Sequence, residues 1–170
     1  IDANDYSIPE IAQMTKATRK IGLGVMGFAD LLVKLRIPYD SELAREVGRE
    51  IMQAIKMAAD VKSIEIGSMR GAFPAWGDSQ YKIHENYRNS CRLTVAPTGT
   101  ISMIAGCASG IEPLFALVWR KQNILEGQTL HYVNEQFKED AKNYGFYSEE
   151  LMAYLSDGGL LENREDVPEW

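Results

Sequence analysis

The chain has 170 residues, enough for one domain that buries about two thirds of its unfolded surface. Apolar residues make up 45% and charged residues 25%, as in an ordinary globular protein. The formal net charge of -6 argues against broad binding to nucleic-acid backbones, although one loop of an acidic protein can still bind a nucleotide. We therefore expect a globular domain that does not bind nucleic acid.

The ends and the cysteines bear on the cellular setting. No apolar run is long enough to cross a bilayer, and the first residues lack the basic and apolar regions of a signal peptide. Cys91 and Cys107 are too few for a disulfide framework, so we expect a reducing, cytoplasmic setting without membrane contact. Because the chain begins with Ile1 and ends in a polar stretch, we expect residues 1–170 to be a single segment, truncated at both ends.

The first helix is predicted by a capping box. Ser7 is followed by Pro9 and Glu10, which together favour a helix that runs to about residue 20. After the glycines of residues 22–27, an apolar stretch predicts a second helix over residues 25–35.

A long third helix follows Pro38. Asp40 or Ser41 is expected to cap it, and the helix is predicted to run from residue 41 to about residue 66 and to stop at Gly67. One apolar face recurs at every fourth position, at Leu43, Val47, Ile51 and Ile55.

The second half of the chain alternates strands and helices. Residues 71–89 are predicted to be loop, residues 93–96 a short buried strand, and residues 114–119 another strand. The spacing of apolar residues over 130–144 predicts an amphipathic helix, and Ser148 is expected to cap a short helix around residues 151–155. The predicted class is α/β with more helix than strand.

The string GLGVMG at residues 22–27 matches the dinucleotide fingerprint G-x-G-x-x-G. That fingerprint requires a preceding strand, so that a tight turn brings pyrophosphate to the next helix. The residues before Gly22 are polar and basic and predicted to be helical. We therefore interpret these glycines as a place where two helices approach closely.

The segment RNSCRLTVAPTGTIS, residues 88–102, carries the main functional signal. A predicted strand ends in Pro97, and hydroxyls and Gly99 follow within five positions. Such a loop can present consecutive backbone N–H groups to a phosphate, and a helical turn opening at Thr100 or Ser102 would add more. No Lys stands at the Walker position. From the residues alone, an ordinary turn rich in Thr and Gly is the favoured explanation of the segment.

This segment, together with GIEP at residues 110–113, resembles the large subunit of ribonucleotide reductases. TRKIGLGVMGFADLL at residues 18–32 resembles a helical region that lies before the phosphate loop in the same family. The sequence PTGTIS, followed by MIAG, is most similar to the corresponding segment of the adenosylcobalamin-dependent class of these enzymes.

The resemblance implies a partial segment of a ten-stranded α/β barrel in an enzyme that reduces ribonucleotides to deoxyribonucleotides by radical chemistry. It implies adenosylcobalamin and a thioredoxin-like reductant for the parent enzyme, neither bound by this segment alone, and contacts with the remainder of the reductase chain. A ribonucleoside di- or triphosphate would contact a loop made of Ala96, Pro97, Thr98, Gly99, Thr100, Ile101 and Ser102.

The residues of the radical chemistry are not found here. The family uses an Asn-x-Cys-x-Glu arrangement and a cysteine pair, but NSCRL at residues 89–93 has Leu93 in place of Glu. Cys91 is interpreted as a small core residue, and Cys107 as a turn residue. We expect no catalytic residue and no metal site in this chain, and we expect it to be inactive alone.

Several other residues are expected to have structural rather than functional roles. His84 and His131 are expected to be structural, the first in a loop and the second on or beside the amphipathic helix. Glu112 is expected to pack, with pairing to Arg88 or capping of the loop as the alternatives, and Trp76 and Trp119 are expected in the core. Two alternatives stay open: a stand-alone nucleotide- or phosphate-binding module, and a purely structural fragment.

Overall fold

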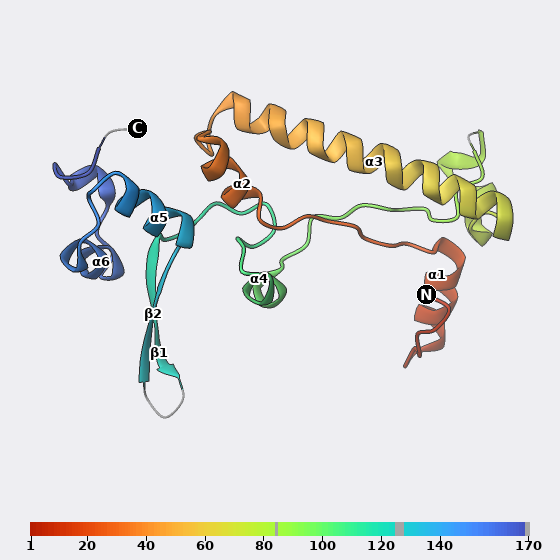
Figure 1. Cartoon of the computed structure of the whole chain (residues 1–170). Coiled ribbons are helices and arrows are strands. Elements are labelled where there is room, and N and C mark those ends of the chain that lie inside the picture. The colour runs from red at the N-terminus through yellow and green to blue at the C-terminus, as the bar shows by residue number, and fades with distance from the viewer. Residues whose placement is uncertain (84, 125–127, 169–170) are drawn as a thin grey trace.

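The computed structural model describes residues 1–83, 85–124 and 128–168. Figure 1 shows an elongated arrangement in which one long helix spans much of the molecule, with a separate helical cluster at the C-terminal end. The α-helices are α1 (Pro9–Thr18), α2 (Phe28–Leu35), α3 (Glu42–Arg70), α4 (Gly99–Ala105), α5 (Glu135–Asn143) and α6 (Glu149–Ser156). Short 3-10 helices are η1 (Pro74–Asp78), η2 (Gln80–Ile83) and η3 (Leu161–Asn163).

Helix α1 forms where predicted, but the capping box does not. Its N-cap residue is Ile8, which makes no side-chain hydrogen bond to the helix. Pro9 occupies the first turn, where its missing N–H costs nothing. The helix ends because Arg19 adopts a left-handed conformation, with φ of 47°. The start of this helix therefore depends on proline rather than on Ser7.

Helix α3 begins as predicted, since the Ser41 hydroxyl accepts a hydrogen bond from the amide of Ala44 at 3.1 Å. It does not stop at Gly67 but continues to Arg70, followed by Gly71. Gly67 is buried inside the helix, where a Cβ would overlap the carbonyl oxygen of Asn86. This glycine allows a close backbone approach, so the prediction of a helix stop was wrong.

The first two glycines of GLGVMG lie in an extended segment that contacts a second extended segment. The predicted close approach of two helices at these glycines is therefore wrong. The amide of Leu23 donates to the carbonyl of Arg92 at 2.9 Å, and the amide of Thr94 donates to the carbonyl of Leu23 at 3.1 Å. A Cβ at Gly24 would lie 2.7 Å from the carbonyl oxygen of Thr94. The small residues therefore let two extended segments meet, and Gly27 then begins α2 with φ of 79°.

The predicted strand at residues 93–96 is reduced to a single parallel bridge between Leu23 and Leu93. Val95 is 69% exposed, so the expected burial is also wrong. Among the described residues, the segment around Leu23 is the β-bridge partner of this segment.

A β-hairpin replaces two predicted elements. Strand β1 (Val118–Ile124) pairs antiparallel with β2 (Gln128–Val133), so the predicted strand at 114–119 begins later and continues further. The predicted helix over 130–144 begins only at Glu135, after Asn134 accepts a hydrogen bond from the amide of Phe137 at 3.0 Å. Leu130 and Val133 fit helical spacing, but the segment also contains β-branched and aromatic residues that favour strands.

The C-terminal cluster has its own apolar core. Ser148 caps α6 as predicted, its hydroxyl accepting from the amide of Leu151 at 3.0 Å. The core is made by the side chains of β1, α5, α6 and the turn between the two helices: Val118, Phe137, Ala141, Phe146, Leu151, Met152 and Leu155.

Candidate functional site

The predicted phosphate loop, residues 96–102, leads into the first turn of α4. Thr98 is the N-cap residue, and the amide of Ser102 donates to its carbonyl at 2.8 Å. The amides of Gly99, Thr100 and Ile101 occupy the first three helical positions, so they have no acceptor inside the helix. No side chain caps them. The turn opens at Gly99, slightly earlier than expected, and its donors are backbone groups.

The three hydroxyls of the loop differ in what they can do. The Ser102 side chain is buried and donates to the carbonyl of Gly99 at 3.3 Å. Thr98 is half-buried, and its hydroxyl oxygen accepts from the amide of Gly110 at 2.7 Å and lies 3.2 Å from the Ser109 hydroxyl. Thr100 is exposed. The structure therefore leaves Thr100 as the accessible hydroxyl and uses Thr98 and Ser102 to shape the loop.

The remaining members of the predicted set lie on the surface. Ala96, Pro97, Gly99 and Ile101 are exposed, Ile101 at 54%. A Cβ added at Gly99 would meet no atom within 4 Å, so the space above this residue is open. A ligand can approach the backbone here without displacing any part of the described chain.

A turn at residues 108–110 is hydrogen-bonded both to the loop and to the beginning of α2. The amide of Gly27 donates to the carbonyl of Ala108 at 2.8 Å, while the amide of Ala108 donates to a carboxylate oxygen of Asp30 at 2.5 Å. With Gly110 bound to Thr98, this turn connects the start of α2 to the start of α4. Sequence reasoning missed Asp30, because its partner lies 78 positions further along the chain.

Arg92, which precedes the loop, forms an ion pair with Asp60. Its Nε donates to Asp60 at 2.6 Å, and its guanidinium carbon lies 4.3 Å from the ring centroid of Tyr87. Burial would raise the pKa of Asp60, but hydrogen bonds from Lys56 and Arg92 outweigh it and hold that pKa below its usual range. The guanidinium of Arg92 is therefore held by Asp60, a carboxylate that it shares with Lys56.

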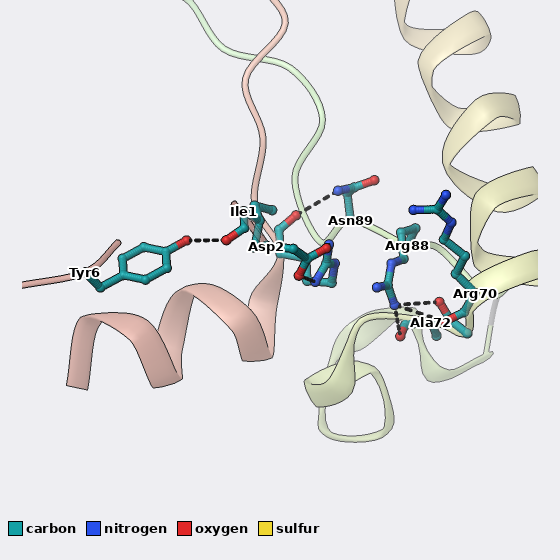
Figure 2. A network of polar contacts seen from close by, with 9 residues as sticks. Ile1, Asp2, Tyr6, Arg70, Ala72, Arg88 and Asn89 are labelled. Atoms are coloured by element: carbon teal, nitrogen blue, oxygen red, sulfur yellow. Dashed lines mark hydrogen bonds and ion pairs between the residues drawn. The ribbon is translucent and has the colours of Figure 1, made fainter. Parts of the chain in front are cut away.

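Arg88 does not pair with Glu112. Figure 2 shows its guanidinium directed at the end of α3, where Nη1 donates to the carbonyls of Arg70, Gly71 and Ala72 at 3.2, 3.1 and 3.4 Å. Burial lowers the pKa of this guanidinium. Glu112 is exposed, and its amide donates to the carbonyl of Ser109.

Asn89 joins the same region to the N-terminal part of the chain. Its side-chain amide donates to the carbonyl of Arg19 at 2.9 Å (Figure 2), and its Oδ1 accepts from the Ser63 hydroxyl at 3.0 Å. Nearby, hydrogen bonding from Arg19 lowers the pKa of Asp2 to about 2. These contacts fix the extended segments against α3.

The two cysteines are free thiols, and one of the two histidines lies among the described residues. Cys91 is exposed, not in the core, because neighbouring side chains of an extended segment alternate and Arg92 takes the side that faces α3. Cys107 is half-buried beside Gly27. His131 lies on β2, opposite Arg120, and not on the helix, while His84 lies outside the described residues.

Trp76 and Trp119 are only partly buried. Trp119 is 37% exposed and stacks on Tyr132 in the hairpin, with the ring centroids 5.7 Å apart. Trp76 is half-buried and donates to the carbonyl of Glu85 at 3.3 Å. Across the described ranges, no group of three or more His, Cys, Asp and Glu side chains is placed to hold a metal ion, and no helix there is long and apolar enough to cross a membrane.

Comparison with known proteins identifies the family to which the chain is similar. It matches the family "Ribonucleotide reductase, barrel domain" over residues 1–87 and 82–169. It is 49% identical over 164 residues to a vitamin B12-dependent ribonucleoside-diphosphate reductase of Thermoplasma acidophilum, covering 96% of this chain and 21% of that protein. It is 45% identical over 168 residues to the enzyme of the same name from Mycobacterium tuberculosis, covering 99% of this chain and 24% of that protein.

A solved structure supports the same fold. The class Id ribonucleotide reductase alpha subunit of Actinobacillus ureae superposes with a TM-score of 0.75 at 21% identity, covering 97% of this chain and 29% of that one. The chain thus spans about a fifth to a quarter of the length of the curated relatives it matches. The chain belongs to the ribonucleotide reductase family, as a helix-rich segment of the barrel domain.

Proposed function

We propose that the parent protein reduces ribonucleoside di- or triphosphates to deoxyribonucleotides by a radical mechanism, and that residues 1–170 are a single segment of its barrel domain. In this proposal residues 96–102 bind the substrate phosphates. The observation that carries it is the set of three amides, at Gly99, Thr100 and Ile101, on an open surface at the start of α4. Oriented amides stabilise phosphate charge without a Lys or Arg.

The roles within the loop follow from the contacts. The amides of Gly99, Thr100 and Ile101 would donate to phosphate oxygens, and the exposed Thr100 hydroxyl would add a fourth donor. Thr98 and Ser102 would hold the turn in shape, since their hydroxyls already bind within the protein. Ala96 and Pro97 bring the chain to this point.

The radical chemistry would come from the rest of the parent protein. This segment has no Asn-x-Cys-x-Glu sequence, so we propose that it lacks the radical cysteine and is inactive alone. We assign adenosylcobalamin to the parent enzyme because the two similar relatives are named vitamin B12-dependent. No step of the proposal depends on a corrin site within residues 1–170.

The same proposal includes a thioredoxin-like reductant, the remainder of the reductase chain as partner, and a cytoplasmic setting. The reductant would return the electrons used in each turnover. Dithiothreitol-dependent reduction of a nucleotide by residues 1–170 alone, with added adenosylcobalamin, is expected to be undetectable, and detectable turnover would contradict the proposal.

A glycine substitution tests the phosphate loop in the parent enzyme. Gly99→Ala should leave the fold intact, because its Cβ meets no protein atom and alanine favours a helix. It should raise the KM for the ribonucleotide about tenfold, or ~1.4 kcal/mol, because the methyl group occupies the space that a phosphate needs. Gly77→Ala, whose Cβ also meets nothing within 4 Å, is the matched control and should not change KM. An unchanged KM for Gly99→Ala would show that this loop does not bind the substrate phosphates.

Calorimetric titration of residues 1–170 separates the alternatives. Selective binding of a ribonucleoside triphosphate over inorganic phosphate, lost in the double variant Thr98→Val and Thr100→Val, would favour a stand-alone binding module. Binding of none of the ligands would favour a loop that works only inside the complete barrel domain.

A further inference from the structure

Asp30 has no role in the phosphate binding proposed above, but its side chain makes two polar contacts within the protein. It lies half-buried in the first turn of α2, three residues after Gly27. One carboxylate oxygen accepts the amide of Ala108 at 2.5 Å, and the other lies 3.5 Å from the side-chain nitrogen of Asn134. A carboxylate that accepts from a backbone amide makes a stronger bond than a neutral acceptor does.

The bond from Asp30 ends on the turn that supports the phosphate loop. Ala108 is also held through its carbonyl, which accepts from the amide of Gly27 at 2.8 Å. Two residues later, the amide of Gly110 donates to the Thr98 hydroxyl at 2.7 Å. Both polar groups of the Ala108 backbone are thus bound by the beginning of α2, and the same turn holds the N-cap residue of α4.

We propose that Asp30 is a positioning residue for substrate phosphate, acting through the turn at residues 108–110 and through Thr98. The inference rests on the proposed function of the loop and names a residue outside that loop which sets its geometry. Asp30 does not touch the substrate in this arrangement. It fixes Ala108, Ala108 fixes the position of Gly110, and Gly110 fixes Thr98, from which the three donating amides follow.

Asparagine is the conservative substitution. In Asp30→Asn the side-chain oxygen can still accept from Ala108, but the bond is no longer charge-assisted, and the new NH2 group faces the NH2 group of Asn134. We expect Asp30→Asn to fold and to raise the KM for a ribonucleoside diphosphate at least threefold in the parent reductase. Asp30→Ala should raise it further, because the amide of Ala108 then has no acceptor.

Inhibition by two fragments of the substrate separates positioning from a general loss of structure. Pyrophosphate carries phosphates without the sugar and base, and the nucleoside carries the reverse. In Asp30→Asn the inhibition constant of pyrophosphate should rise as KM does, while that of the nucleoside stays within twofold of wild type. Asp78→Asn removes an exposed carboxylate by the same chemical change and should alter neither constant.

A double-mutant cycle tests the route through Thr98. Thr98→Val removes the acceptor of the Gly110 amide, so Asp30→Asn should have less effect on KM in that background than in wild type. Fully independent effects would contradict the route. Equal rises of the pyrophosphate and nucleoside inhibition constants, or no rise in either, would overturn the positioning role.

Failure of this inference can be told apart from failure of the proposed function. If Gly99→Ala raises KM but Asp30→Asn matches Asp78→Asn, the loop binds phosphate and Asp30 does not position it. If Gly99→Ala has no effect, the loop is not the phosphate site, and both proposals are wrong.

Discussion

The guanidinium of Arg92 and the carboxylate of Asp60 form an ion pair, with Nε 2.6 Å from Oδ1 and the two side chains 9% and 17% exposed. Arg92 also donates to the carbonyl of Asn89 at 2.9 Å and stacks over Tyr87. The other oxygen of Asp60 lies 2.6 Å from Nζ of Lys56. This network fastens the chain just before the proposed phosphate loop to the middle of α3.

Removal of Arg92 should destabilise the chain. Arg92→Ala is expected to lower the free energy of unfolding by roughly 3 kcal/mol, because the largely buried carboxylate of Asp60 loses one of its two cationic partners and the contacts of the buried guanidinium are lost. Arg92→Lys keeps the charge but loses the planar fork, and should cost less. Urea denaturation followed by tryptophan fluorescence measures both. Arg49→Ala, at an exposed pair with Glu42 of 3.9 Å, is the control and should cost under about 1 kcal/mol. Equal losses for Arg92→Ala and Arg49→Ala would argue against a structural role for the ion pair.

The same pair predicts a pH dependence. Burial opposes ionisation of Asp60, but hydrogen bonds from Lys56 and Arg92 prevail, so its pKa is lower in the folded chain than in the unfolded chain. Its stabilisation is therefore complete above the unfolded value of about 4 and is lost as the pH falls through the lower folded value. Wild type should exceed Asp60→Asn in stability by a constant amount from pH 7 to pH 5, and by less at pH 3. Denaturation midpoints across this range provide the measurement, and a difference that is the same at pH 3 and pH 7 would refute it.

Two glycines of α3 should differ in how much alanine destabilises the chain. Gly67→Ala should destabilise by several kcal/mol, because its Cβ would overlap the carbonyl of Asn86 and force two backbones apart. Gly48→Ala places a Cβ 3.3 Å from the edge of the Phe28 ring, so the gain in helix propensity of about 1 kcal/mol offsets a small crowding cost. Thermal unfolding of the two variants tests this. If Gly67→Ala is as stable as Gly48→Ala, Gly67 is not at a close backbone approach.

The C-terminal core should be sensitive at Leu151. This side chain is fully buried among the residues of α5, α6 and β1, so Leu151→Ala should cost about 2–5 kcal/mol. Leu160, which is 54% exposed, provides the matched control, and its alanine variant should cost under about 1 kcal/mol. Amide exchange of α5 and α6 would report the loss locally. Unchanged protection in Leu151→Ala would show that this cluster does not depend on its core.

Local signals predicted much of the helical structure. Ser41 and Ser148 cap the helices that the sequence assigned to them, because a hydroxyl that satisfies a nearby amide needs only a few neighbouring residues. The hairpin was missed for the complementary reason. Leu130 and Val133 satisfy helical spacing, and the pairing of β2 with β1 depends on a partner strand that periodicity does not reveal.

The sequence by itself determined the family, through two long motifs in the right order, and the position of the candidate phosphate loop. Tertiary structure alone decided how that loop is held: Gly24 against Thr94, Gly110 on Thr98, and Ala108 on Asp30. It also decided that Gly67 lies inside a helix and that Cys91 faces outward. Caps and periodicity act within one or two turns of the chain, whereas these contacts join residues far apart in sequence, and their geometry exists only once the segments have packed.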